Sequence, residues 1–138
     1  MNDLISVEGL TKHFSVRGTR SANKKSVIKA VENVTFGLGA GETLALVGET
    51  GCGKSTVARL LVGLLRPTTG RVLYNGVDLS SFSAGEMRKV RREIQMVFQD
   101  PYASLNPRRT VRQLVAEAWK IHPGMVPKQE RSARADQL

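Results

Sequence analysis

The sequence predicts an α/β fold, and three observations lead to that prediction. Residues 43–47 (TLALV) form a short, continuous apolar run, which is typical of a strand buried on both faces. A glycine-rich segment follows this run directly. After it, four apolar residues have the spacing of one helix stripe: Val57, Leu60, Leu61 and Leu64. Two β-rich segments, 5–14 and 27–36, come before this unit, so we expect an antiparallel β part at the N-terminus.

The composition is that of a folded chain without an export signal. The 138 residues are 41% hydrophobic, which suffices for a core. The single cysteine, Cys52, excludes an internal disulfide, and no Cys/His cluster has zinc spacing. No apolar stretch is long enough for a spanning helix, and the N-terminus lacks a signal-peptide pattern, so we expect a soluble chain.

The basic charge does not by itself indicate a nucleic-acid partner. Lys and Arg number 21 against 12 Asp and Glu, a net charge of +9. The excess is spread along the chain and is not a basic tail. The basic run 88–92 lies on a predicted helix without interleaved aromatic residues, which favours a solvated face. We therefore expect no nucleic-acid partner.

Further strands and an exposed loop are predicted between these landmarks. The polar, basic segment 15–26 interrupts the β pattern and indicates a loop. The breaker cluster 66–70 ends the helix that carries the apolar stripe, and residues 71–75 then predict a strand. Residues 94–98 (IQMVF) are a short apolar run, which predicts another strand.

Two helices begin with capping-box patterns. Ser83 is followed three positions later by Glu86, which predicts the start of a basic helix that continues through Arg92. Thr110 and Gln113 have the same spacing, and an apolar stripe after them predicts a helix to about Ile121. Residues 127–138 have the pattern of a further helix that has no cap at Leu138, so we expect the sequence to stop within this element.

The segment after the buried run carries the chemistry. Residues 48–55 (GETGCGKS) match G-x-x-x-x-G-K-[ST], the P-loop. Its glycines let backbone N–H groups point inward, the helix N-terminus adds partial positive charge, and the lysine reaches the terminal phosphates. We expect this segment to bind ATP and Mg²⁺ through the residues Gly48, Glu49, Thr50, Gly51, Cys52, Gly53, Lys54, Ser55 and Thr56.

Together with the P-loop, three other segments resemble one family. They are residues 7–14 (VEGLTKHF), 69–76 (TGRVLYNG) and 95–110 (QMVFQDPYASLNPRRT). The chain resembles the N-terminal part of an ATP-binding subunit of an ABC transporter, and most closely the oligopeptide and dipeptide importer branch. The resemblance implies an incomplete P-loop NTPase core of the ABC ATPase type, with the ATP-binding part over 1–100 and the start of the helical subdomain over 101–138.

The resemblance also implies roles for single residues. Phe14 matches the aromatic position that stacks on adenine; without the resemblance, a core residue at a strand end is the better interpretation. Gln99 matches the glutamine that contacts Mg²⁺ or the attacking water and links the nucleotide site to the membrane partner. Lys54 and Gln99 are thus the predicted catalytic residues, and Ser55 and Gln99 are the predicted Mg²⁺ ligands. His122 precedes Pro-Gly and fits a loop histidine better than a catalytic base.

Other motifs of the family do not occur in the 138 residues. Hydrolysis in this family needs an apolar run that ends in Asp-Glu and an LSGGQ-like signature, and we find neither. We therefore expect a chain truncated before these motifs, which binds MgATP but hydrolyses it negligibly by itself. The implied partners are membrane permease subunits, a second ATP-binding subunit and, indirectly, a periplasmic binding protein. The implied location is the cytoplasmic face of the bacterial inner membrane.

Two alternatives remain open on the sequence. One is a small P-loop nucleotide or metabolite kinase, in which Arg108, Arg109 and Arg112 would act as lid residues; it leaves the segment 104–107 (SLNP) unexplained. The other is a non-enzymatic remnant that only binds nucleotide or a partner chain.

Overall fold

A computed structural model describes residues 3–16, 26–100 and 105–137 of the chain. The chain divides into two compact units, Met1–Met96 and Val97–Leu138. The first unit holds a sheet and the P-loop. The described residues of the second unit include two helices.

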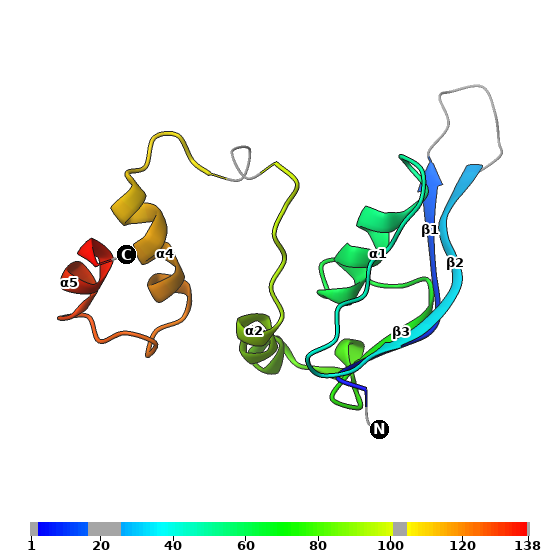
Figure 1. The fold of residues 1–138 in the computed structure, drawn as a ribbon, viewed down its shortest axis with the longest axis horizontal. Coiled ribbons are helices and arrows are strands. Elements are labelled where there is room, and N and C mark those ends of the chain that lie inside the picture. Colours follow the sequence, from blue (N-terminus) through cyan, green and yellow to red (C-terminus); the bar gives the residue numbers. More distant parts are fainter. Residues whose placement is uncertain (1–2, 17–25, 101–104, 138) are drawn as a thin grey trace. The chain divides into compact units, whose positions relative to one another are not determined.

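An antiparallel sheet forms the centre of the first unit (Figure 1). Its strands are β1 (Ile5–Val16), β2 (Ser26–Leu38), β3 (Thr69–Tyr74) and β4 (Val77–Asp78), in the order β2-β1-β3-β4. The N-terminal antiparallel part is confirmed. The loop predicted over 15–26 lies mostly outside the described residues, and its ends belong to β1 and β2.

Helix α1 (Lys54–Leu61) packs on this sheet and completes the core. Val57 and Leu60 of its apolar stripe are buried, whereas Leu64 lies beyond the helix and is 51% exposed. The helix ends in a Schellman motif, since the Gly63 N–H donates to Leu60 O and the Leu64 N–H to Arg59 O. The sheet supplies Val7, Leu10, Val31 and Val72 to the same core, and η1 (Leu79–Ser81) supplies Leu79.

The two capping boxes form as predicted. In the first unit, the Ser83 hydroxyl accepts from the Glu86 N–H, the Glu86 carboxylate accepts from the Ser83 N–H, and α2 (Ala84–Glu93) begins there. In the second unit, Thr110 and Gln113 make the same reciprocal pair at the start of α4 (Val111–Ile121). Local side-chain chemistry thus determines where both helices start.

Two predicted strands are wrong for the described residues. Residues 43–47 and 94–98 have no strand structure, and Leu44, Leu46 and Val47 are 46%, 42% and 93% exposed. A buried strand needs neighbouring strands for its backbone N–H and C=O groups. No strand among the described residues pairs with either segment. The apolar runs therefore form neither strand nor helix in the described residues.

In the described part of the second unit, α4 is followed by a shorter helix, α5 (Arg131–Asp136). An ion pair between Arg112 and Asp136 joins the two helices, and Trp119 is buried. The helix predicted over 127–138 is thus confined to six residues and ends at Asp136, before Leu138, which lies outside the described residues.

Candidate functional site: the P-loop and its cavity

The P-loop leads into α1 without a side-chain cap. Gly53 occupies the N-cap position, and it has no side chain that could bond the first N–H groups of the helix. Its carbonyl accepts from the N–H groups of Thr56 and Val57, both at 2.9 Å. The first turn also carries no acidic residue. The positive end of the helix dipole is therefore not offset by a local carboxylate, which suits an anion.

The ammonium group of Lys54 lies against the loop itself. Its Nζ donates to the carbonyl oxygens of Gly48 and Glu49, at 2.7 and 2.6 Å, and lies 3.6 Å from the Cys52 Sγ. The Glu49 carbonyl also accepts from the Cys52 N–H at 3.3 Å. The loop thus closes around its own lysine, and a cationic group stands where the motif places the phosphates.

Gly53 holds the loop close to β2. Its φ is +103°, and a Cβ at this position would lie 2.2 Å from the Ala30 carbonyl oxygen. A distance that short is a steric clash with backbone, so the close approach of loop and strand requires glycine.

The loop and β2 line an open cavity of about 380 Å³. Its lining includes Cys52, Gly53 and Lys54 from the loop and α1, and Lys29, Ala30 and Glu32 from β2. The sequence predicted that Cys52, Gly53 and Lys54 belong to the nucleotide site, but it did not predict this for the β2 residues. Only the tertiary contact between Gly53 and Ala30 brings that strand to the loop, and no local pattern in 27–36 points to it.

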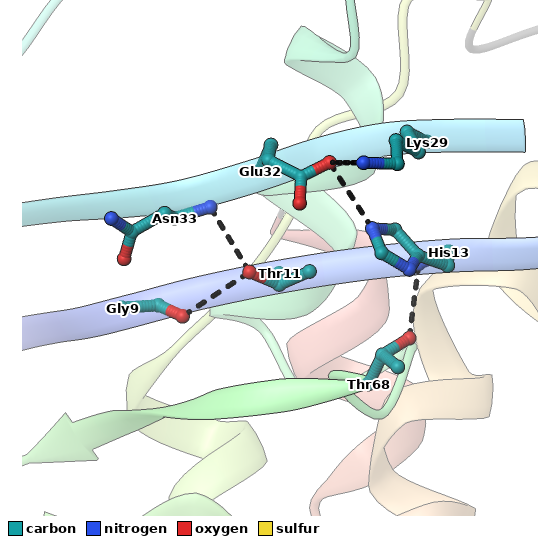
Figure 2. Close-up of polar contacts among 7 residues, drawn as sticks. All are labelled: Gly9, Thr11, His13, Lys29, Glu32, Asn33 and Thr68. Carbon is teal, nitrogen blue, oxygen red and sulfur yellow. Dashed lines mark hydrogen bonds and ion pairs between the residues drawn. The ribbon is translucent and has the colours of Figure 1, made fainter.

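Two of the β2 residues belong to a polar cluster (Figure 2). The Glu32 Oε2 lies 3.2 Å from the Lys29 Nζ and 3.2 Å from the His13 Nε2 of β1. Hydrogen bonds from Lys29 and His13 hold the pKa of the Glu32 carboxyl below its ordinary value of 4.5. The charge of Glu32 is thus maintained at the cavity wall, where it is paired with Lys29.

The side chains at this site fit a phosphate group with a divalent cation. Lys54 supplies an ammonium. Ser55, the second residue of α1, supplies an exposed hydroxyl. Thr50 and Gly51 belong to an exposed turn before the helix. A hydroxyl and phosphate oxygens are the hard oxygen donors that Mg²⁺ takes. No group of three or more His, Cys, Asp and Glu among the described residues could hold a metal by protein ligands alone.

Phe14 and Gln99, predicted from the resemblance, are both exposed. Phe14 lies near the end of β1, opposite Ile28 of β2, with 36% of its surface exposed. Gln99 belongs to the second unit, so the structure does not test its proximity to the P-loop. No helix among residues 3–16, 26–100 and 105–137 has the length and apolarity needed to cross a membrane.

A glycine-rich loop that closes on a lysine and opens an uncapped helix beside a sheet defines a P-loop nucleotide-binding protein. Comparisons with known proteins narrow this class. The family model described as "ABC transporter" matches residues 31–138. The chain therefore belongs to the ABC transporter family, and its fold is an incomplete P-loop core of the ABC ATPase type.

Curated relatives and solved structures agree with this assignment. The chain is 53% identical over 114 residues to the probable peptide ABC transporter ATP-binding protein y4tS of Sinorhizobium fredii, covering 83% of this chain and 32% of that protein. It is 43% identical over 136 residues to the oligopeptide transport ATP-binding protein AppF of Bacillus subtilis, covering 98% and 41%. The chain thus spans less than half the length of either relative.

Among solved structures, a dimeric, post-hydrolysis state of the ATP-binding cassette MJ0796, bound to ADP and Pi, matches with a TM-score of 0.75 at 27% identity. The match covers 96% of this chain and 54% of that one. The cbiO1 protein of Clostridium perfringens matches with a TM-score of 0.67 at 26% identity, covering 99% and 49%. None of these relatives favours the kinase alternative.

Proposed function

We propose that this chain binds MgATP through residues 48–56, as the nucleotide-binding part of an ATP-binding subunit that drives peptide import. The observation that carries the proposal is the position of Lys54, whose ammonium lies within the loop at 2.7 and 2.6 Å from the Gly48 and Glu49 carbonyls. The names of the two curated relatives, both of which refer to peptide transport, support the substrate class.

Each residue of the site has a distinct part in this proposal. Phosphate oxygens accept from the backbone N–H groups at the start of α1, and Lys54 leaves the loop carbonyls to pair with them. Ser55 and Gln99 would hold Mg²⁺, and Phe14 would stack on the adenine. When bound, the Mg²⁺ neutralises charge on the phosphates.

The proposal extends to partners and location. The subunit would act at the cytoplasmic face of the bacterial inner membrane, with membrane permease subunits, a second ATP-binding subunit and, indirectly, a periplasmic binding protein. The dimeric form of the solved MJ0796 cassette supports a second ATP-binding subunit. The names of the relatives, which refer to transport, support the permease.

Titration calorimetry with MgATP tests nucleotide binding. We expect the unaltered chain to bind, and Lys54→Ala to lose affinity at least about tenfold, because a charge-assisted hydrogen bond contributes about 1.5–3 kcal/mol. Lys89→Ala is the matched control, since Lys89 is an exposed lysine on α2 of the same unit. Equal, negligible heats for all three proteins would contradict the proposal, as would unchanged affinity in Lys54→Ala.

A further inference from the structure

The side chain of Lys12 lies between an aromatic ring and a backbone carbonyl. Its Nζ is 5.2 Å from the centroid of the Phe14 ring and donates to the Arg66 carbonyl oxygen at 2.7 Å. A cation within about 6 Å of a ring centroid is attracted to the negative face of the ring. The hydrogen bond to Arg66 holds the ammonium in place, so one face of Phe14 is occupied by a fixed charge.

The backbone around this contact is also fixed. The strand register shifts between Lys12 and His13, and the His13 N–H donates to the Thr68 Oγ1 at 2.9 Å. The Thr68 N–H in turn donates to the Thr11 carbonyl at 2.8 Å. Both Arg66 and Thr68 belong to the connection between α1 and β3. The end of β1 that carries Phe14 is therefore tied to the chain that leaves the P-loop helix.

We infer that Lys12 is a positioning residue for the base of the nucleotide: it holds the Phe14 ring by one face and leaves the other face to stack on adenine. The inference rests on the proposed function, in which Phe14 stacks on the base. Phe14 keeps 36% of its surface exposed, so the ring is covered only in part. A ring held in one orientation before binding loses less conformational freedom when the base arrives.

A comparison of two ligands tests this role. Calorimetry would measure MgATP, which carries the base, and magnesium tripolyphosphate, which does not. We expect Lys12→Met, which removes the charge but keeps a long apolar side chain, to weaken MgATP binding about two- to fivefold. Tripolyphosphate affinity should be unchanged. Lys12→Arg should restore MgATP binding, because a guanidinium also stacks on a ring and donates hydrogen bonds.

Two controls separate positioning from other effects. In a Phe14→Ala background, Lys12→Met should have no additional effect on MgATP, since the ring it positions is absent. Lys89→Met removes an exposed lysine of α2 and should change neither affinity.

Specific outcomes would overturn the inference. A loss of affinity for both ligands equally in Lys12→Met, as an unfolded variant would also show, would mean that Lys12 does not act through the ring. The same conclusion would follow if Lys12→Arg binds MgATP as poorly as Lys12→Met does. If the unaltered chain binds both ligands equally well, the base adds nothing and the inference fails while phosphate binding stands. If the chain binds neither ligand, the proposed function itself fails.

Discussion

Gly53 is the residue at which the phosphate-binding loop packs against the sheet. Its backbone has a positive φ of +103°, and a Cβ would meet the Ala30 carbonyl at 2.2 Å. Gly51 also has a positive φ, +85°, but a Cβ there would meet nothing within 4 Å. The two glycines therefore separate the effect of conformation from the effect of close approach.

We expect Gly53→Ala to destabilise the first unit more than Gly51→Ala does. Unfavourable φ alone costs about 1–3 kcal/mol in either variant. Only Gly53→Ala must also move the loop away from β2. Urea unfolding followed by circular dichroism would compare the two. Equal losses of stability would show that the contact between Gly53 and Ala30 does not matter.

Glu32 gives the first unit a pH dependence whose sign is set by its lowered pKa. Hydrogen bonds from Lys29 and His13 favour the ionised carboxyl in the folded chain, whereas the unfolded chain has the ordinary pKa of 4.5. The contribution to stability is therefore complete above about pH 4.5 and is lost as the pH falls through the folded-state value.

We expect Glu32→Gln to flatten the pH dependence of the thermal midpoint below about pH 4.5, because the amide does not titrate. Glu42→Gln serves as the control, since the Glu42 carboxylate accepts a hydrogen bond from the Gly39 N–H but lies outside the cluster of His13 and Lys29. If Glu32→Gln and the unaltered chain have the same profile in this pH range, the cluster in Figure 2 does not contribute.

At the scale of elements, the capping boxes determine where helices begin. The Ser83 hydroxyl accepts from the Glu86 N–H at 3.3 Å, and the Ser83 N–H donates to the Glu86 Oε2 at 2.9 Å. Helix α2 has no fully buried residue, and Met87 and Val90 pack against the core while partly exposed, so its N-terminal hydrogen bonds add to a limited packing contribution.

We expect Ser83→Ala to destabilise α2 by about 1 kcal/mol, because it leaves an N-terminal N–H without its partner. Amide hydrogen exchange in residues 84–93 would measure the loss. Ser83→Asp, which keeps an accepting oxygen at the N-cap, should retain most of the protection. Equal exchange in Ser83→Ala and the unaltered chain would mean that α2 is stabilised elsewhere.

Local sequence patterns predict helices more reliably than strands in this chain. Residues 57–61 form a helix as their stripe predicts, because an α-helix satisfies its backbone hydrogen bonds within itself. Residues 43–47 and 94–98 have equally clear apolar patterns, yet neither is a strand among the described residues. A strand depends on a neighbour, and the local sequence does not specify whether that neighbour is present.

At the scale of the whole chain, binding and hydrolysis of ATP are separable. The 138 residues include the P-loop and Gln99 but no apolar run that ends in Asp-Glu and no LSGGQ-like signature. Phosphoryl transfer in P-loop proteins needs a second acidic Mg²⁺ ligand and a group that positions the water.

We therefore expect the 138-residue chain to bind MgATP without detectable turnover in a phosphate-release assay. The Lys54→Ala variant gives the background from any contaminating ATPase. A turnover of about 1 s⁻¹, the low end for typical enzymes, that disappears in Lys54→Ala would contradict this expectation.

The sequence by itself determined the P-loop and the two capped helices, because each depends on neighbours within a few residues. Its β pattern also indicated the N-terminal strands, but their pairing with each other and with β3 joins residues far apart in the chain. Gly53, Lys54 and Ser55 are consecutive, so the helix start that the motif predicts brings them together. The tertiary structure alone decided that Lys29, Ala30 and Glu32 line the cavity and that Lys12 lies over Phe14. These contacts depend on the register of β1 against β2 and on the Arg66 carbonyl, 54 residues from Lys12, which no local pattern specifies.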